Sequence, residues 1–87
     1  MKSSTTRNFW RMFDALPRDV QARARTAFEL WRHDASHPSL QFKRVDSEQP
    51  IYSVRIGLHY RALGLLRGDT VNWFWIGSHD AYDRMLS

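Results

Sequence analysis

Hydrophobic residues in the first part of the chain recur with a helical period. They stand three or four positions apart between residues 8 and 15, which predicts a short first helix. Pro17 suits the first position of a second helix, and Asp19 complements the dipole in its first turn. The apolar stripe of that helix comprises Val20, Ala24, Ala27, Phe28 and Trp31. Charged residues lie largely on its other side, so the second helix is predicted to be amphipathic.

Beyond Pro38, which cannot continue a helix, the pattern becomes that of β-strands. Tyr, Val, Ile, Leu and Trp are frequent here, and strands are predicted at residues 40–45, 51–56, 60–66 and 70–76. Residues 46–50 read as a polar loop. Gly68-Asp69 is a two-residue hairpin signal, so the last two strands are expected to pair in antiparallel fashion. Residues 81–86 predict one terminal helical turn.

These elements predict an α+β fold. Two N-terminal helices are expected to pack on one face of a four-stranded antiparallel twisted sheet, with the opposite face open. Residues 1–7 are small, polar and aperiodic, so we expect a flexible arm there. Residues 8–87 are expected to form a single domain.

Composition limits the class of protein further. The 87 residues, 43% of them apolar and 14% aromatic, suffice for one hydrophobic core. The absence of cysteine excludes disulfides and thiolate metal ligands. No apolar run has the length of a signal peptide or a membrane span. We therefore expect a soluble cytoplasmic protein with no membrane partner.

The charge of the chain is biased toward arginine. Thirteen basic against nine acidic residues give a net charge of 13 − 9 = +4, and eleven of the thirteen are arginine. Arginine binds phosphate in a bidentate manner and stacks on bases. The partner can therefore be RNA, DNA or an acidic protein, and an ordinary basic surface remains an alternative.

Arg55 and Arg61 are the first candidate site residues. If Gly57-Leu58-His59 forms a turn, the two arginines lie directly opposite each other on paired strands. Two such cations repel by roughly 0.2–1 kcal/mol, and an anion between them would reverse the sign. As an alternative, either arginine can pair with a nearby carboxylate or extend into water.

His79 and Tyr82 are the second pair of candidates. They follow the apolar strand that ends near Gly77, where a backbone can present them to a ligand. Since RNA carries its own nucleophile in the 2′-hydroxyl, a ribonuclease needs only a base, an acid and cations, and no metal. A capping or surface role for His79 and a core-closing role for Tyr82 are equally open.

Other motifs are weaker. His33 and His37 have the spacing of a zinc pair, but Pro38 interrupts the helix there, so we expect no metal site. Trp73 and Trp75 are predicted to point to the same face of their strand, with at least one available for binding.

Five segments together resemble the RelE/ParE toxin superfamily of bacterial toxin–antitoxin systems, and more closely its RelE/HigB-like branch. The resemblance is carried by Phe13-Asp-Ala-Leu-Pro17, His37-Pro-Ser-Leu-Gln-Phe-Lys43, Tyr52-Ser-Val-Arg55, Tyr60-Arg61-Ala-Leu-Gly64, and Trp75-Ile-Gly-Ser-His79 followed by Tyr82.

The resemblance implies an endoribonuclease that cleaves mRNA on the ribosome and is bound by a cognate antitoxin, without a metal or other cofactor. By position, Arg55 and Arg61 match the phosphate-binding residues, and His79 and Tyr82 match the basic and tyrosine positions after the last strand. Lys43 and Arg44 are expected to contact RNA. Two alternatives remain: a ParE-like inhibitor of DNA gyrase that acts by binding, and a degenerate toxin that only binds its antitoxin.

Overall fold

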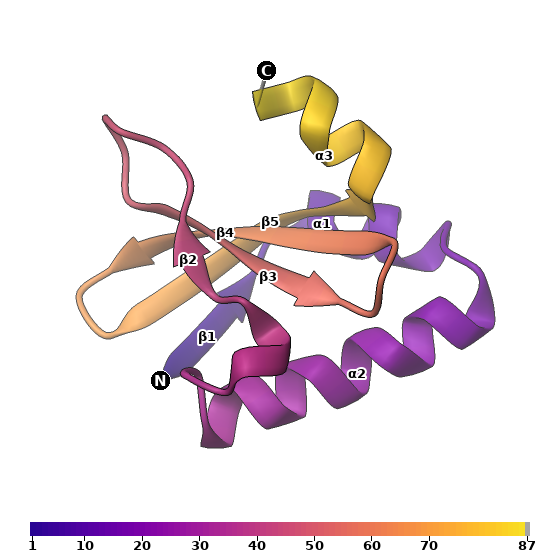
Figure 1. The fold of residues 1–87 in the computed structure, drawn as a ribbon, viewed down its shortest axis with the longest axis horizontal. Helices are drawn as coiled ribbons and strands as arrows, with labels where there is room; N and C mark the ends of the chain where they lie inside the picture. Colours follow the sequence, from indigo (N-terminus) through magenta and orange to yellow (C-terminus); the bar gives the residue numbers. More distant parts are fainter. Residues whose placement is uncertain (87) are drawn as a thin grey trace.

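The computed structural model describes residues 1–86 and contains the predicted helices and strands in a mixed α+β fold (Figure 1). The elements are β1 (Lys2–Thr5), α1 (Arg7–Asp14), α2 (Arg18–His33), a 3₁₀ turn (Pro38–Leu40), β2 (Lys43–Arg44), β3 (Ile51–Ile56), β4 (Tyr60–Arg67), β5 (Thr70–Ser78) and α3 (His79–Leu86). The α+β class and the two N-terminal helices are confirmed.

The sheet has five strands in the order β1-β5-β4-β3-β2, so the prediction of four antiparallel strands was wrong. Residues 2–5, which we expected to form no regular structure, are β1 and pair in parallel with β5. All four side chains of β1 are exposed, so this edge strand carries no hydrophobic period that the sequence could reveal. It forms because the backbone groups of β5 need partners.

Local signals explain where both N-terminal helices begin. The side chain of Thr6 accepts a hydrogen bond from the Phe9 backbone N–H at 3.1 Å and caps α1. Pro17 is the N-cap of α2, one residue before the helical position that we predicted for it. Asp19 lies in the first turn of α2, as the dipole argument expects.

Two element boundaries differ from the predictions. The strand expected at residues 40–45 is reduced to Lys43–Arg44, because Leu40 is buried in the 3₁₀ turn and Gln41 adopts a left-handed conformation with φ of 44°. At the C-terminus, the single turn expected at residues 81–86 is an eight-residue helix. The hydroxyl of Ser78 accepts from the Ala81 N–H at 3.1 Å, which stabilises the start of this helix.

The main core lies between α1, α2 and one face of the sheet. Trp31 is 0% exposed and Trp73 is 1% exposed, and their ring centroids lie 5.2 Å apart in an edge-to-face arrangement. Phe28 and Phe42 also pack against Trp73. In Figure 1, α2 lies on one side of the sheet and α3 on the other. The face opposite α2 is therefore partly covered, and not fully open as we had predicted.

A β-bulge in β5 turns Trp73 and Trp75 to opposite faces, which corrects the prediction that they share one. Gly64 pairs with Trp73, whereas the preceding Leu63 pairs with Trp75, so Phe74 is the extra residue. Gly64 is required here, since a Cβ at this position would lie 2.3 Å from Cγ1 of Val71 and 2.8 Å from Cε3 of Trp73. The missing side chain thus gives the Trp73 indole its place in the core.

Candidate active site

The candidate residues gather on the sheet face opposite α2, here called the open face. Two rows of paired residues cross it: Arg55, Arg61 and Gly77 in one row, and Lys43, Ser53, Leu63 and Trp75 in the other. Their neighbours in sequence, such as Val54, Ala62 and Ile76, face the main core. Strand alternation along β3 and β4 therefore places Arg55 and Arg61 on the face away from the main core.

Arg55 and Arg61 lie directly opposite each other on β3 and β4, as the turn at residues 57–59 predicted. Nε of Arg55 donates to the Gly57 carbonyl at 2.9 Å, and Nη1 of Arg61 donates to the Tyr60 carbonyl at 3.2 Å. Partial burial lowers the pKa of Arg61 from its ordinary value, and the positive charge of Arg55 lowers it further. Tyr82 and Asp83 oppose this shift. The paired cations are therefore in an environment that a bound anion would stabilise.

The helix α3 brings His79 and Tyr82 to the same pair. The guanidinium carbon of Arg61 lies 5.9 Å from the centroid of the Tyr82 ring, within cation–π range. The rings of His79 and Tyr82 stack with centroids 5.9 Å apart and an interplanar angle of 20°. All four predicted site residues are thus brought together at one end of the open face.

Tyr82 is nevertheless only 7% exposed, and its hydroxyl donates to the buried Ser53 hydroxyl at 3.4 Å. In this conformation the phenol anchors α3 to β3 and supports the Arg61 guanidinium from below. The arrangement matches the core-closing alternative that the sequence left open. A proton-transfer role would require the hydroxyl to leave Ser53.

His79 has a carboxylate partner that our sequence reasoning missed. Its Nε2 lies 3.3 Å from Oδ2 of Asp83, one helical turn later, while its buried Nδ1 has no hydrogen-bond partner among residues 1–86. The i, i+4 spacing of His79 and Asp83 on a helix was the signal that could have revealed this pair. The carboxylate therefore lies on the Nε2 side of the imidazole, within ion-pair distance of it.

The two expected RNA-contacting residues of β2 do not share a face. Lys43 pairs with Ser53 and extends the second row of the open face. Arg44 pairs with Tyr52 on the other face, and its Nε donates to the Asp46 carbonyl at 2.9 Å. Only Lys43 therefore continues the basic surface from the arginine pair.

Trp75 lies on the open face beside this surface. A Cβ on Gly77 would come within 2.7 Å of Cζ2 of Trp75, so the indole ring folds over the glycine that pairs with Arg61. The ring is partly exposed. It supplies a flat aromatic surface next to the cations.

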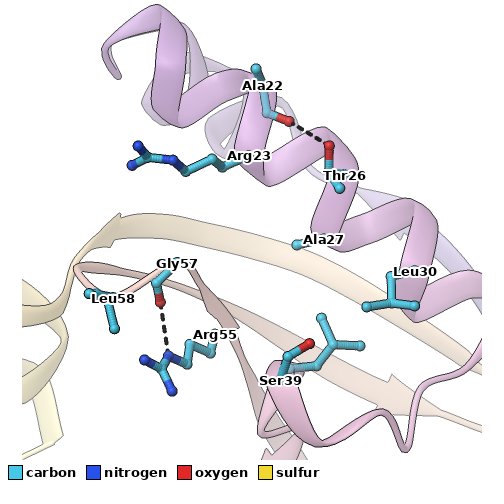
Figure 2. A pocket seen from close by; sticks show the side chains of 10 residues that line it. Ala22, Arg23, Thr26, Ala27, Leu30, Ser39, Arg55, Gly57 and Leu58 are labelled. Atoms are coloured by element: carbon cyan, nitrogen blue, oxygen red, sulfur yellow. Dashed lines mark hydrogen bonds between the residues drawn. The ribbon is translucent and has the colours of Figure 1, made fainter.

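A groove of 580 Å³ opens on the other side of Arg55, between α2 and the turn that joins β3 to β4 (Figure 2). Its apolar wall includes Ala22, Ala27, Leu30, Leu40 and Leu58. Arg23 from α2 and Arg55 from β3 also line it. Leu58 is 70% exposed, so the groove has an uncovered apolar side next to two cations.

Neither a metal centre nor a membrane span is found in the part of the chain that the structure describes. Residues 1–86 hold no group of three or more His, Cys, Asp or Glu side chains placed to bind a metal ion. None of the described helices is long and apolar enough to cross a membrane.

The chain matches the family model of the ParE-like toxin domain over residues 18–84. It therefore belongs to the RelE/ParE superfamily, the toxins of toxin–antitoxin systems. A search among curated protein sequences found no match.

Solved structures share the fold at low sequence identity. RelE in the RelB–RelE antitoxin–toxin complex from Methanococcus jannaschii aligns with a TM-score of 0.76 and 16% identity, covering 97% of this chain and 99% of that one. YafQ from E. coli strain BL21(DE3) aligns with a TM-score of 0.74 and 7% identity, covering 93% of this chain and 96% of that one. The YoeB/ParE toxin from Agrobacterium tumefaciens aligns with a TM-score of 0.71 and 12% identity, covering 91% of this chain and 99% of that one.

Proposed function

We propose that the chain is a metal-independent endoribonuclease toxin that cleaves mRNA on the ribosome and represses translation. The observation that carries this proposal is the Arg55–Arg61 pair next to the imidazole of His79. Two paired cations without an interposed carboxylate fit a phosphate whose negative charge grows in the transition state. A protein that acts only by binding has no chemical need for an imidazole beside them.

In the proposed reaction the RNA 2′-hydroxyl attacks its own phosphate, and the bond from phosphorus to the 5′-oxygen breaks. Arg55 and Arg61 hold the phosphate, and His79 transfers a proton. Tyr82 supports Arg61 and His79 through its ring. The products are a 2′,3′-cyclic phosphate and a 5′-hydroxyl.

Lys43 and Trp75 extend the proposed RNA-binding surface. Lys43 lies on the open face, where it can contact a neighbouring phosphate. The partly exposed indole of Trp75 offers a surface on which a base can stack. Arg44, also expected from the sequence to contact RNA, would do so from the other face of the sheet.

The test is growth arrest and primer extension on cellular transcripts after induction without an antitoxin. We compare the wild type with Arg61→Ala and His79→Ala, and use Arg67→Ala, an exposed arginine at the far end of β4, as the matched control. Loss of a transition-state donor costs about 10²–10³ in rate, so the first two variants should lose cleavage while Arg67→Ala keeps it. Equal cleavage by all four proteins would exclude this site.

The second candidate function is inhibition of DNA gyrase by binding. Two observations favour it: the matching family model is that of the ParE-like toxins, and the Tyr82 hydroxyl is buried. Purified gyrase and supercoiled DNA decide between the two functions. Inhibited supercoiling with intact mRNA would support gyrase as the target, whereas mRNA loss with normal supercoiling would support the ribonuclease. A protein that does neither but binds its antitoxin would be a degenerate toxin.

We also propose that the groove between α2 and the β3–β4 turn receives an acidic, amphipathic segment of the cognate antitoxin. The RelE relative from M. jannaschii was solved with its antitoxin, which supports such a partner. The groove combines an apolar wall with Arg23 and Arg55, so it suits a segment with apolar and carboxylate side chains. An antitoxin bound here would also engage one arginine of the candidate site.

Neutralisation by the antitoxin tests this interface. Leu58→Asp places a negative charge on the exposed apolar side of the groove and should weaken antitoxin binding at least about tenfold. Met85→Asp on α3 is the control, since Met85 is also exposed but does not line the groove. Titration of each purified toxin with antitoxin gives the affinities. The same affinity for Leu58→Asp and wild type would place the interface elsewhere.

A further inference from the structure

The proposed cleavage needs two proton-transfer groups, and the structure leaves one of them unassigned. One group must remove the proton of the 2′-hydroxyl, and another must protonate the departing 5′-oxygen. Tyr82 is a poor second group in this conformation, because its hydroxyl is bonded to Ser53 inside the fold. An exposed group near the arginine pair is therefore needed.

His59 is placed to fill this role. It lies in the turn that joins Arg55 on β3 to Arg61 on β4, and its side chain is exposed. The His59 carbonyl accepts a hydrogen bond from the His79 backbone N–H at 2.7 Å. This bond holds the two histidines side by side at the end of the sheet where the arginine pair also lies.

The two imidazoles have different surroundings. Nε2 of His79 lies 3.3 Å from the Asp83 carboxylate, within ion-pair distance, so the group next to this imidazole is an anion. The imidazole of His59 makes no hydrogen bond or ion pair with any other residue in the described range.

The elements packed near the turn of His59 are β3, β4, α2 and α3, and each of them carries charged groups. Arg55 and Arg61 flank its turn on the strands, and the stem of Arg23 from α2 packs over Gly57, where a Cβ would lie 3.6 Å from its Cδ. The carboxylates of Asp80 and Asp83 belong to α3. His59 therefore lies in a turn whose two flanking strands each carry an arginine, whereas His79 has a carboxylate as its neighbour on α3.

From this geometry we infer that His59 is a catalytic residue, the general base of the proposed ribonuclease, with His79 as the general acid. The inference rests on the proposed function. His59 accepts the 2′-hydroxyl proton as the 2′-oxygen bonds to phosphorus. The bond from phosphorus to the 5′-oxygen breaks, and His79, acting in its imidazolium form, passes its Nε2 proton to that oxygen and becomes a neutral imidazole. The products are the 2′,3′-cyclic phosphate and the 5′-hydroxyl, and a later proton exchange with water restores both histidines.

An RNA with sulfur in place of the bridging 5′-oxygen separates the two roles. A thiolate leaves without protonation, so this substrate removes the need for an acid but not for a base. Single-turnover cleavage of the oxygen substrate and of the sulfur substrate is measured for wild type, His59→Gln and His79→Gln. Each substrate is tested as free RNA and as mRNA in a reconstituted ribosomal complex. We expect His59→Gln to be slower by about 10²–10⁴-fold on both substrates. His79→Gln should be slow on the oxygen substrate and recover on the sulfur substrate.

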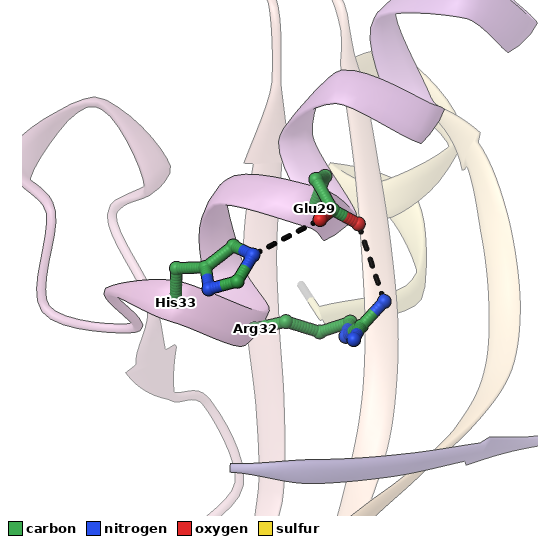
Figure 3. Close-up of polar contacts among 3 residues, drawn as sticks. All are labelled: Glu29, Arg32 and His33. Carbon is green, nitrogen blue, oxygen red and sulfur yellow. Dashed lines mark hydrogen bonds and ion pairs between the residues drawn. The ribbon is translucent and has the colours of Figure 1, made fainter.

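His33→Gln is the matched control, because His33 lies on the surface of α2 and contacts Glu29 at 3.0 Å, beside Arg32 (Figure 3). It should cleave like wild type, and thermal melting should show the same fold for all variants. If His59→Gln cleaves as fast as wild type, or recovers on the sulfur substrate, the inference is wrong while the proposed function stands. If the wild type itself cuts neither free nor ribosome-bound RNA, the proposed function fails, and the role of His59 fails with it.

Discussion

The two faces of the central sheet differ in what holds them together. The face toward α2 is built from large apolar side chains, and Trp31 and Trp73 at its centre are almost completely buried. The open face carries Arg55 and Arg61, and α3 covers it only in part, through Tyr82. One face thus supplies most of the hydrophobic stabilisation, while the other keeps two cations together at a cost to stability.

The contrast shows how so small a domain separates stability from chemistry. Alternation along β3 and β4 places core and site residues one position apart in the sequence. Substitutions on the two faces should therefore affect different properties of the protein. Changes on the covered face should reduce the free energy of unfolding, and changes on the open face should reduce activity.

Trp31→Ala should give the largest effect on stability. Trp31 is fully buried and packs edge-to-face on Trp73 and Phe42, so its removal should lower the free energy of unfolding by about 3–5 kcal/mol. Trp10→Ala is the control, because Trp10 is 42% exposed and should cost roughly 1 kcal/mol or less. Urea unfolding monitored by circular dichroism measures both. Similar losses would mean that burial against α2 is not what stabilises the domain.

Two glycines, one on each face of the sheet, allow the faces to be compared directly. Gly64→Ala forces a methyl group against Val71 and Trp73 in the packed core and should cost about 1–3 kcal/mol. Gly77→Ala meets the ring of Trp75, which is partly exposed and can swing outward, so we expect a smaller cost. Thermal melts of both variants show which substitution destabilises the protein more. An equal or larger loss for Gly77→Ala would show that the open face is packed as rigidly as the core.

Tyr82→Phe removes the bond to Ser53 and keeps the ring. The buried Ser53 hydroxyl loses its partner, so stability should fall by about 0.5–1.5 kcal/mol. Cleavage should stay within a few-fold of wild type, because the ring still supports Arg61 and His79. Parallel unfolding and cleavage assays test this. A rate loss of about 10² or more would show instead that the phenol transfers a proton.

Arg55→Gln should have the smallest effect on stability, and it should stabilise the protein, whereas the preceding variants destabilise it. Removing one of two facing cations relieves repulsion, so the free energy of unfolding should rise by about 0.2–1 kcal/mol. RNA affinity should fall, and the slope of log affinity against log salt should decrease by about 1. Arg67→Gln, on an exposed strand end, should leave stability unchanged. A less stable Arg55→Gln protein would mean that Arg55 is structurally required.

Parts of the candidate site were predictable because they depend on local pairing. The turn at residues 57–59 and the two flanking strands place Arg55 opposite Arg61 whatever the rest of the fold does. The position of Tyr82 was not predictable in the same way. Its hydroxyl bonds to Ser53, 29 residues earlier, and no spacing along the chain encodes that contact.

The roles of Lys43, Arg44 and His59 also depended on long-range register. Lys43 and Arg44 are neighbours in the sequence, and pairing with β3 turns them to different faces. His59 was predicted only as part of a turn. Its relation to His79 arises because β4 and β5 pair so that their ends meet.

The sequence by itself determined the two N-terminal helices, the positions of β3, β4 and β5, the β4–β5 hairpin and the arginine pair. Each follows from apolar periodicity or turn residues within one or two adjacent elements. Only the tertiary structure decided that residues 2–5 complete the sheet, that Trp73 and Trp75 part at a bulge, and that α3 closes over part of the open face. Those features are set by backbone groups and side chains that meet across the fold, and a pattern along the chain carries no information about which distant partner satisfies them.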